Sequence, residues 1–234
     1  MNAIQTILIA FVILTLIYYL IKWFTTESKK ISKTEKGTTT TTIPSNKLKN
    51  NNIGNFTYSV WFNVSDWNYN YGEDKTLFVV QSKDTASKVP LEVKMGNTEN
   101  NIDINVRCYG DNNNDISHKC SITNFPLQKW VCLIISVYGR TLDVYLDGKL
   151  TQTCVLPGPS NMQKLSKVIV TPKNKGFQGL TSDLTYYSKS CNPQEAYNIY
   201  KSGFGSSSFS GLVNKYKLKI SFLENDEEKW YMDI

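Results

Sequence analysis

Near its N-terminus the chain carries an apolar run, from Ala3 to Ile21, with only three polar interruptions. A helix of about 19 residues rises roughly 1.5 Å per residue and is about 28 Å long, which matches the hydrocarbon thickness of a bilayer. No lysine or arginine precedes the run and no small-x-small cleavage site follows it, so a retained anchor is favoured over a cleaved signal peptide. Residues 1–24 are therefore predicted to form a single transmembrane helix.

The residues at the end of this run predict the membrane interface and the orientation. Tyr18, Tyr19, Lys22 and Trp23 belong to residue types that gather at the headgroup level, so they are predicted to mark the interface. Seven lysines and only two glutamates lie between Lys22 and Lys49. Because positively charged flanks stay on the cytoplasmic side, the C-terminal domain is predicted to lie on the cytosolic side of a lipid bilayer.

Residues 25–52 are predicted to be a flexible linker rich in lysine and threonine, since they contain almost no large apolar residue. The whole chain has a net charge of +6, and most of this charge lies in the linker. The rest of the chain is nearly neutral, which argues against nucleic acid as a partner.

The five cysteines are odd in number and show no C-x-x-C spacing, so the sequence predicts neither a zinc ribbon nor a complete disulfide framework. They are Cys108, Cys120, Cys132, Cys154 and Cys191. Reduced, buried thiols are favoured, and pairing is left open. Two sequons, at Asn55 and Asn63, would matter only if the domain faced the secretory lumen.

Period-two patterns dominate the chain from residue 53 onward. Between Phe56 and Val64 every second residue is apolar or aromatic, which is typical of a strand with one buried face. Further alternation predicts a three-stranded meander, in which Asp147-Gly148 is a strong hairpin signal because both turn positions need a positive φ. The predicted strands are about Trp130–Tyr138, Thr141–Leu146 and Lys149–Val155 in the meander, with Leu77–Gln81, Leu91–Met95, Ile102–Cys108, Lys167–Val170 and Leu180–Tyr186 elsewhere.

One helix is predicted late in the chain. Asn192 is a good N-cap, Pro193 suits the first helical position, Glu195 completes a capping box, and Gly203 can end the helix. Many antiparallel strands with a single late helix predict an all-β jelly-roll sandwich over residues 53–204.

Two stretches of this domain resemble the concanavalin A-like, laminin G-like jelly-roll family. The first stretch is Leu127 to Val137 followed by Leu142 to Leu150, and the second runs from Gly176 to Tyr187 and on to the helix at Asn192–Tyr200. The resemblance implies a concanavalin A-like sandwich with one short C-terminal helix. It leaves function open, because the superfamily contains lectins, glucanases and adhesion modules.

The glucanases of this superfamily carry an E-x-D-x-E strand, in which one glutamate attacks and the other transfers protons. The nearest match here is Asn101-Ile102-Asp103-Ile104-Asn105, with asparagine at both glutamate positions. An amide can neither attack an anomeric carbon nor pass a proton. The protein is therefore predicted not to be an enzyme, and no catalytic residue is assigned.

A calcium site is the only cofactor that the sequence suggests. Asp111, Asn113 and Asp115 offer oxygen ligands at alternate positions, but neither the glycine nor the bidentate glutamate of a complete calcium loop follows. A solvated turn is favoured, and no cofactor is expected.

Two groups of aromatic residues are candidates for contact with a ligand or partner. Trp67, Tyr69 and Tyr71 alternate in the loop after the first strand, where rings could stack on a carbohydrate or cover a protein contact. Residues 205–234 form a C-terminal extension whose large apolar residues predict docking on the chain's own sandwich or on another subunit. The clamp residues would be Phe222, Trp230 and Tyr231.

The combination of anchor, linker and sandwich predicts a non-enzymatic structural protein that binds other protein subunits. It resembles the membrane-associated minor capsid proteins of large icosahedral DNA viruses, which implies a virion protein that tethers an internal membrane to a capsid shell. The alternative is a lectin-like or adhesion protein displayed on a membrane.

Overall fold

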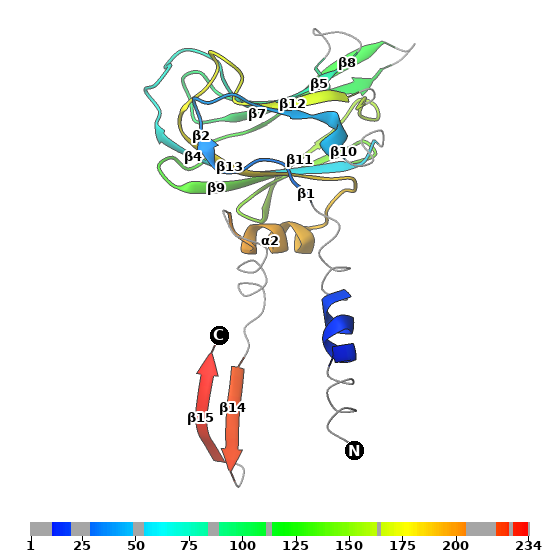
Figure 1. Ribbon diagram of the computed structural model, residues 1–234. Helices are drawn as coiled ribbons and strands as arrows, with labels where there is room; N and C mark the ends of the chain where they lie inside the picture. The colour runs from blue at the N-terminus through cyan, green and yellow to red at the C-terminus, as the bar shows by residue number, and fades with distance from the viewer. Residues whose placement is uncertain are drawn as a thin grey trace.

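The computed structural model of the protein describes residues 11–19, 29–48, 54–83, 89–110, 114–162, 165–204, 219–224 and 227–233. Two antiparallel sheets face each other, and a helix packs against the outer face of one of them (Figure 1). The predicted all-β sandwich is confirmed.

The larger sheet has seven strands in the order β1-β13-β4-β9-β10-β11, and β2 also pairs with β13. Their bounds are β1 Lys29–Lys30, β2 Glu35–Lys36, β4 Phe56–Asp66, β9 Trp130–Tyr138, β10 Thr141–Leu146, β11 Lys149–Val155 and β13 Gln178–Tyr187. The smaller sheet has six strands in the order β3-β12-β5-β6-β7-β8. Their bounds are β3 Thr41–Pro44, β5 Lys75–Ser82, β6 Leu91–Met95, β7 Ile102–Tyr109, β8 Asp115–Ile122 and β12 Leu165–Val170.

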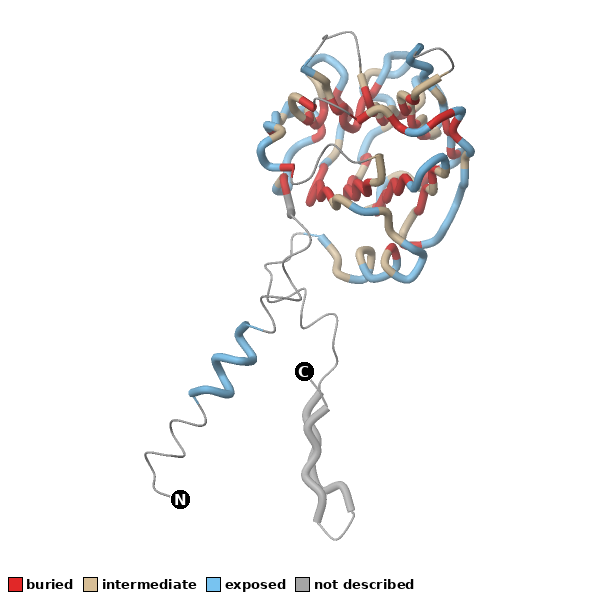
Figure 2. Tube along the Cα trace, turned by 90° about the vertical axis from the view of Figure 1, so that its right-hand side faces the viewer, coloured by how far each residue is buried: buried red, intermediate tan, exposed pale blue. Residues whose placement is uncertain are grey.

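The core lies between the two sheets, where the apolar positions of the alternating strands meet. Phe62 of β4, Val80 of β5, Ile104 of β7 and Leu133 of β9 have no exposed surface. In Figure 2 the buried segments accordingly form two facing layers. Because each strand places every second side chain in this layer, the intervening side chains are left on the two outer faces.

The predicted meander is confirmed with its bounds. The backbone φ is 49° at Asp147 and 73° at Gly148, as a tight hairpin turn requires. The preceding turn at Gly139 also has a positive φ, of 58°.

The predicted helix is also confirmed, as α2 over Pro193–Lys201. The Asn192 side chain accepts a hydrogen bond from the backbone N–H of Glu195, and the Glu195 carboxylate accepts one from the backbone N–H of Asn192. Ala196 is buried against an apolar patch on the outer face of the seven-stranded sheet. That patch contains Trp61, Cys132, Ile134 and Tyr145.

The structure corrects the predicted linker at residues 25–52. Residues 29–48 contribute β1, β2, β3 and a 3₁₀ helix over Ser45–Lys47, and β3 pairs with β12 so that Ile43 lies beside Val168. Ile43 and Leu48 are buried, with 2% and 4% of their surface exposed. An edge strand needs few apolar residues of its own because its neighbour supplies hydrogen bonds, which is why composition alone indicated a linker.

The predicted anchor lies largely outside the described residues. Residues 11–19 are helical, and the hydroxyl of Thr15 donates to the carbonyl of Phe11. Among the helices in the described ranges, none has the length and apolarity needed to span a bilayer. Lys22 and Trp23 lie outside the described residues.

Part of the C-terminal extension forms a hairpin of β14 (Lys219–Glu224) and β15 (Glu227–Asp233). These two strands make a separate two-stranded sheet. The register places Phe222 opposite Trp230 and Ser221 opposite Tyr231. The three predicted clamp residues thus lie on paired strands, and their contact with a partner stays a prediction.

Candidate functional site

The outer face of the six-stranded sheet carries polar residues arranged in rows. The register places Glu92 of β6 beside Asn105 of β7, and Asn105 beside Lys119 of β8. In the next row Lys94 lies beside Asp103. Along β6 and β7 these residues alternate with fully buried ones, so this row pattern faces away from the core.

Asp103 occupies the position that the sequence aligns with the glucanase triad, and its carboxylate is engaged by two groups on β8. It lies 2.7 Å from the Lys119 ammonium and accepts a hydrogen bond of 2.7 Å from Ser121 Oγ. The flanking Asn101 amide donates to Glu99 over 2.7 Å. A carboxylate held in this way is suited to binding and positioning.

Lys94 connects two carboxylates at the end of this face. Its ammonium lies 3.3 Å from Asp74 and 3.5 Å from Glu92. Partial burial by itself lowers the pKa of Lys94, but the two carboxylates outweigh it and raise the pKa. The network therefore keeps Lys94 charged and orders the side chains around it.

Asn105 lies in the middle of β7, between Glu92 and Lys119, and has spare hydrogen-bonding capacity. Its side chain makes no hydrogen bond within the part of the chain that the structure describes. The guanidinium of Arg107, two residues along β7, lies 3.9 Å from Asp115. An amide with both donors and an acceptor available, between charged neighbours, can bind a polar ligand.

The loop between β4 and β5 separates the three aromatic residues that the sequence grouped together. Trp67 packs against the core, with its ring 5.8 Å from Phe125 and the Lys75 ammonium 4.7 Å from its centroid. Its indole N–H donates to the carbonyl of Thr98 over 3.3 Å. Trp67 is thus partly buried and held by these contacts, and its predicted role in contacting a glycan or partner stays a prediction.

Lys75, which covers Trp67, is a buried cation that orders this loop. Its ammonium donates to the carbonyl of Asn70 over 2.9 Å. Burial lowers the pKa of Lys75, and the nearby Glu73 partly opposes this shift. A buried lysine could not be predicted here from the residue pattern, because its partners are backbone carbonyls.

Tyr69 and Tyr71 remain available on the loop, with 39% and 58% of their surface exposed. The backbone N–H of Gly72 donates to the carbonyl of Asn97 over 3.0 Å, which holds the loop to the neighbouring turn. Asp74 ends the loop and binds Lys94. The loop that carries the two exposed tyrosines is therefore attached to one end of the polar face.

The predicted calcium ligands are only partly described. Asp111 and Asn113 lie outside the described residues. Asp115 begins β8 and accepts a hydrogen bond of 2.9 Å from the amide of Asn161, besides its contact with Arg107. Within the described ranges, no group of three or more metal-ligating side chains comes together.

A separate hollow lies on the seven-stranded sheet and has no counterpart in the predictions. Its volume is about 400 Å³. It is lined by Lys36, Thr38, Asn63, Ser65, Gln178, Gly179 and Leu180. Lys36 belongs to the segment predicted to be a linker, so the hollow could not be assembled from sequence.

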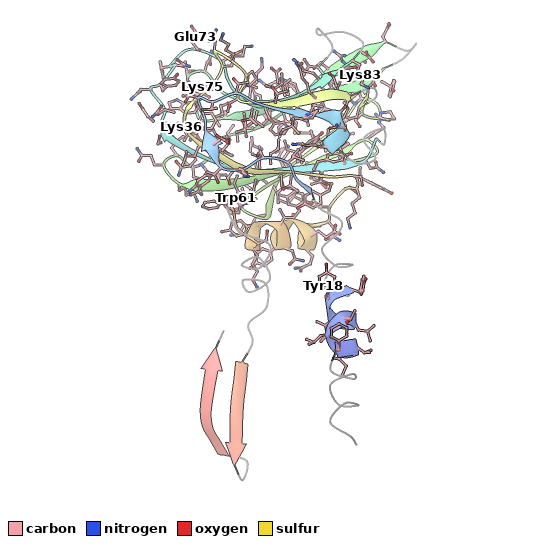
Figure 3. The ribbon with its side chains drawn as sticks, viewed as in Figure 1. Tyr18, Lys36, Trp61, Glu73, Lys75 and Lys83 are labelled. Atoms are coloured by element: carbon pink, nitrogen blue, oxygen red, sulfur yellow. A yellow bond between two sulfur atoms is a disulfide. The ribbon has the colours of Figure 1, made fainter. Side chains whose placement is uncertain are left out.

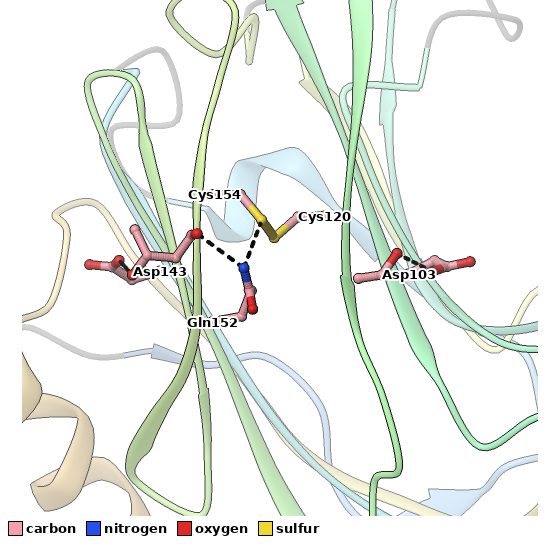
Figure 4. Close-up of a disulfide and its surroundings, with 7 residues drawn as sticks. Asp103, Cys120, Asp143, Gln152 and Cys154 are labelled. Atoms are coloured by element: carbon pink, nitrogen blue, oxygen red, sulfur yellow. Dashed lines mark hydrogen bonds between the residues drawn. A yellow bond between two sulfur atoms is a disulfide. The ribbon is translucent and has the colours of Figure 1, made fainter.

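The cysteines divide into one bridge and three free thiols. Cys120 of β8 and Cys154 of β11 form a disulfide, which corrects the favoured interpretation of five reduced thiols (Figure 4). Cys108 and Cys132 are buried, and Cys191 is half-buried. Burial raises the pKa of all three free thiols, so they are poor nucleophiles at neutral pH.

Similarity to solved structures is consistent with the sandwich. The binding domain of botulinum neurotoxin DC, in complex with rat synaptotagmin II, aligns with a TM-score of 0.53 and 12% identity over 70% of this chain and 40% of that chain. The receptor-binding domain of the botulinum neurotoxin C/D mosaic serotype aligns with a TM-score of 0.54 and 16% identity over 76% of this chain and 43% of that chain. The receptor-binding domain of botulinum neurotoxin D aligns with a TM-score of 0.52 and 16% identity over 74% of this chain and 43% of that chain. At this identity the likeness concerns the fold alone, and the chain spans less than half of each of these structures.

No curated protein matches the chain. A protein family does: the Concanavalin A-like lectin/glucanases superfamily, in its laminin G form, matches residues 35–196. The match begins within β2 and ends within α2, and so includes part of the segment predicted to be a linker. The chain belongs to the concanavalin A-like lectin/glucanase superfamily.

Proposed function

We propose that this protein is a non-enzymatic, membrane-anchored recognition protein that binds an oligosaccharide on the outer face of its six-stranded sheet. The observation that carries the proposal is the free amide of Asn105, which lies between Glu92 and Lys119 on that face. An amide flanked by an acceptor and a donor is complementary to adjacent sugar hydroxyls.

The tyrosines beside this face complete the proposed site. Sugars present flat apolar patches as well as hydroxyls, and exposed rings bury such patches at small entropic cost. Tyr71 is 58% exposed on the loop whose last residue, Asp74, pairs with Lys94 of this face. Membership of a superfamily that contains lectins supports the same role.

The absence of catalysis is part of the proposal. Asn101 and Asn105 replace the two glutamates that a glucanase of this superfamily uses, and Asp103 is held by Lys119 and Ser121. A retaining mechanism needs two carboxyl groups about 5 Å apart across the scissile bond. The proposed role of Asp103 is therefore to orient Lys119.

The membrane anchor is proposed from the apolar run at residues 1–24, with the domain on the cytosolic side. Because the structure places residues 29–48 in the sandwich, only residues 25–28 separate the anchor from the domain. The recognition face would then be held close to one bilayer.

Binding is tested with the full chain in detergent micelles, first on a glycan array and then by titration with the best glycan. Asn105→Ala is expected to weaken binding about tenfold, which corresponds to about 1.4 kcal/mol. Tyr71→Ala is expected to weaken it as well. The matched control is Asn198→Ala, which removes an exposed amide from α2 and should leave affinity unchanged.

Two results would count against the proposal. Unchanged affinity in both Asn105→Ala and Tyr71→Ala would remove the six-stranded face as the site. Hydrolysis of a bound glycan that disappears in Asp103→Ala would show that the protein is an enzyme.

A protein partner is a second candidate, favoured by the hairpin of β14 and β15. These strands pair with each other and with no other strand among those described. An isolated two-stranded hairpin is marginally stable in water, so a docking partner would explain its retention. The predicted tether between a membrane and a capsid shell is one form of this candidate, and removal of residues 219–233 followed by co-sedimentation with assembled particles tests it.

A further inference from the structure

The chain enters and leaves the sandwich on the side that carries α2. It enters at β1, where Lys29 pairs with Tyr186, one residue before the end of β13. After β13 the chain turns directly into α2, and the described part of the sandwich ends at Phe204. Figure 1 shows α2 beneath the seven-stranded sheet and β1 at the edge of the same sheet.

The outward side of α2 presents aromatic and basic residues. Tyr197 is 47% exposed, and Lys201 is exposed one turn further along the helix. The spacing of four residues places the two on one side of the helix. This combination of ring and ammonium groups is typical of protein surfaces that meet the headgroup region of a bilayer.

The aromatic side chains between α2 and the seven-stranded sheet are closely packed. They hold the outward side of the helix at a fixed distance from the sheet. Phe204 stacks on Trp130 with ring centroids 4.1 Å apart, and its ring lies 5.1 Å from Trp61. Tyr200 stacks on Trp61 at 5.7 Å. The outward residues of α2 therefore cannot fold back onto the sheet without breaking this aromatic stack.

At one end of this outer face, the charge is suited to contact with lipid phosphates. Lys36 lines the 400 Å³ hollow, whose lining contains no carboxylate. A second hollow, of about 430 Å³ beside the start of α2, contains Asp143 and Glu195. Glu195 is paired with Lys189 at 3.2 Å, and Asp143 accepts a hydrogen bond from Thr153. These two carboxylates are thus partnered, whereas Lys36 has no ion pair among the described residues.

We propose that the α2 side of the domain lies against the bilayer, with Tyr197 and Lys201 among the lipid headgroups and the six-stranded sheet facing away. The inference rests on the proposed anchor at residues 1–24. Four residues then connect the anchor to β1, and four extended residues reach at most about 14 Å. Because a helix with its side chains is about 10 Å thick, α2 occupies most of that distance.

This arrangement also explains why recognition and anchoring do not compete. Asn105 lies on β7, in the sheet opposite the one against which α2 packs. Figure 3 shows Lys75 at the six-stranded sheet and Trp61 beside α2, with the interior of the sandwich between them. A ligand in solution would reach the face with Asn105 without displacing lipid.

The test uses the full chain reconstituted into liposomes of phosphatidylcholine with a minor fraction of phosphatidylserine. Cys191 is first replaced by serine, because it is the only half-buried free thiol among the described residues. A nitroxide spin label is then attached to Tyr197→Cys on α2. The matched control is Ser117→Cys, an exposed position on the outer face of β8.

The readout is the collision rate of each label with oxygen, which partitions into lipid, and with a water-soluble nickel complex. The label at position 197 is expected to show a higher ratio of oxygen to nickel collisions than the label at position 117. Equal ratios in protein that resists alkaline carbonate extraction would overturn this orientation while leaving the anchor intact. Extraction of the chain by carbonate would overturn the anchor and this inference together.

Discussion

Cys120 and Cys154 join the outermost strands of the two sheets. β8 ends the six-stranded sheet and β11 ends the seven-stranded sheet, and the two Cα atoms are 6.1 Å apart across the gap. On the opposite side of the sandwich the edges are formed by the short strands β1, β2 and β3. The disulfide therefore closes the side on which both edge strands are long.

Removal of this disulfide is expected to lower the free energy of unfolding by about 3–4 kcal/mol, because the bridge spans 34 residues of the chain. The double variant Cys120→Ala/Cys154→Ala should show a lower midpoint in urea than the wild type. Reductant should lower the wild-type midpoint and leave the double variant unchanged. A wild-type midpoint that is indifferent to reductant would mean that the bridge does not stabilise the fold.

The orientation of the domain sets two signals against each other. The lysine-rich flank predicts a cytosolic domain, whereas disulfides form and persist mainly in oxidising compartments. Because flanking charge acts during membrane insertion, before the domain folds, we expect it to decide the orientation. Protease added to intact microsomes should then digest the domain, and the disulfide would form afterwards in an oxidising setting.

Protection from protease would reverse this orientation. A glycan on Asn55 or Asn63 would also reverse the predicted orientation. The two asparagines lie in different surroundings. The Asn55 side chain accepts a hydrogen bond of 2.8 Å from the backbone N–H of Gly139, whereas Asn63 lines the open hollow. A glycan on Asn63 would fill that hollow.

Tyr58→Phe is expected to stabilise the protein by about 1 kcal/mol. The Tyr58 hydroxyl is buried in the core and has no hydrogen-bond partner among the described residues. Removing an unsatisfied buried polar group without changing the ring relieves its desolvation cost. Tyr186→Phe is the matched control, since its ring lies 5.1 Å from that of Tyr58 and its hydroxyl is not among the buried groups that lack a partner. A lower midpoint in urea for Tyr58→Phe would show that its hydroxyl is bound.

Stability is expected to fall as the pH rises from about 10 to about 12. Burial raises the pKa of Tyr145 and of Tyr186 from 10.0 to about 12. Over this interval the unfolded chain loses tyrosine protons that the folded chain retains, so ionisation favours unfolding. Urea midpoints measured across the interval, together with an ultraviolet titration of tyrosinate, test this. Tyr138→Phe, at an exposed position, should not change the profile.

Gly179→Ala is expected to destabilise the sandwich by more than 1 kcal/mol, roughly the cost of a strained backbone position. The φ of Gly179 is 154°, and a Cβ there would collide with the carbonyl oxygen of Asn63. Gly54→Ala is the control, because its Cβ would make only an ordinary contact of 3.9 Å with Ser160. Equal urea midpoints for the two variants would show that β13 can shift away from β4.

The local sequence pattern was sufficient to predict those parts of the fold that are stabilised by residues close together in the chain. The meander of β9, β10 and β11 follows from alternation and from the turn at Asp147-Gly148, and α2 follows from its capping box. Interactions between residues close together in the chain determine both the meander and the helix. The residues that resemble the family lie in the same segments. The position of Asp103 and Asn105 on one face of β7 could also be predicted, because a strand with alternate apolar residues leaves the others on one face.

Only the tertiary structure decided which distant segments meet. β1, β2 and β3 carry few apolar residues and gain their hydrogen bonds from β13 and β12, so their own sequence resembled a linker. The bridge from Cys120 to Cys154 depends on two edges that approach only after the sheets pack. Trp67 packs against the core beside Phe125, whereas Tyr69, two residues later, stays exposed. In each case the stabilising partner is far away in the sequence, and periodicity carries no information about such a partner.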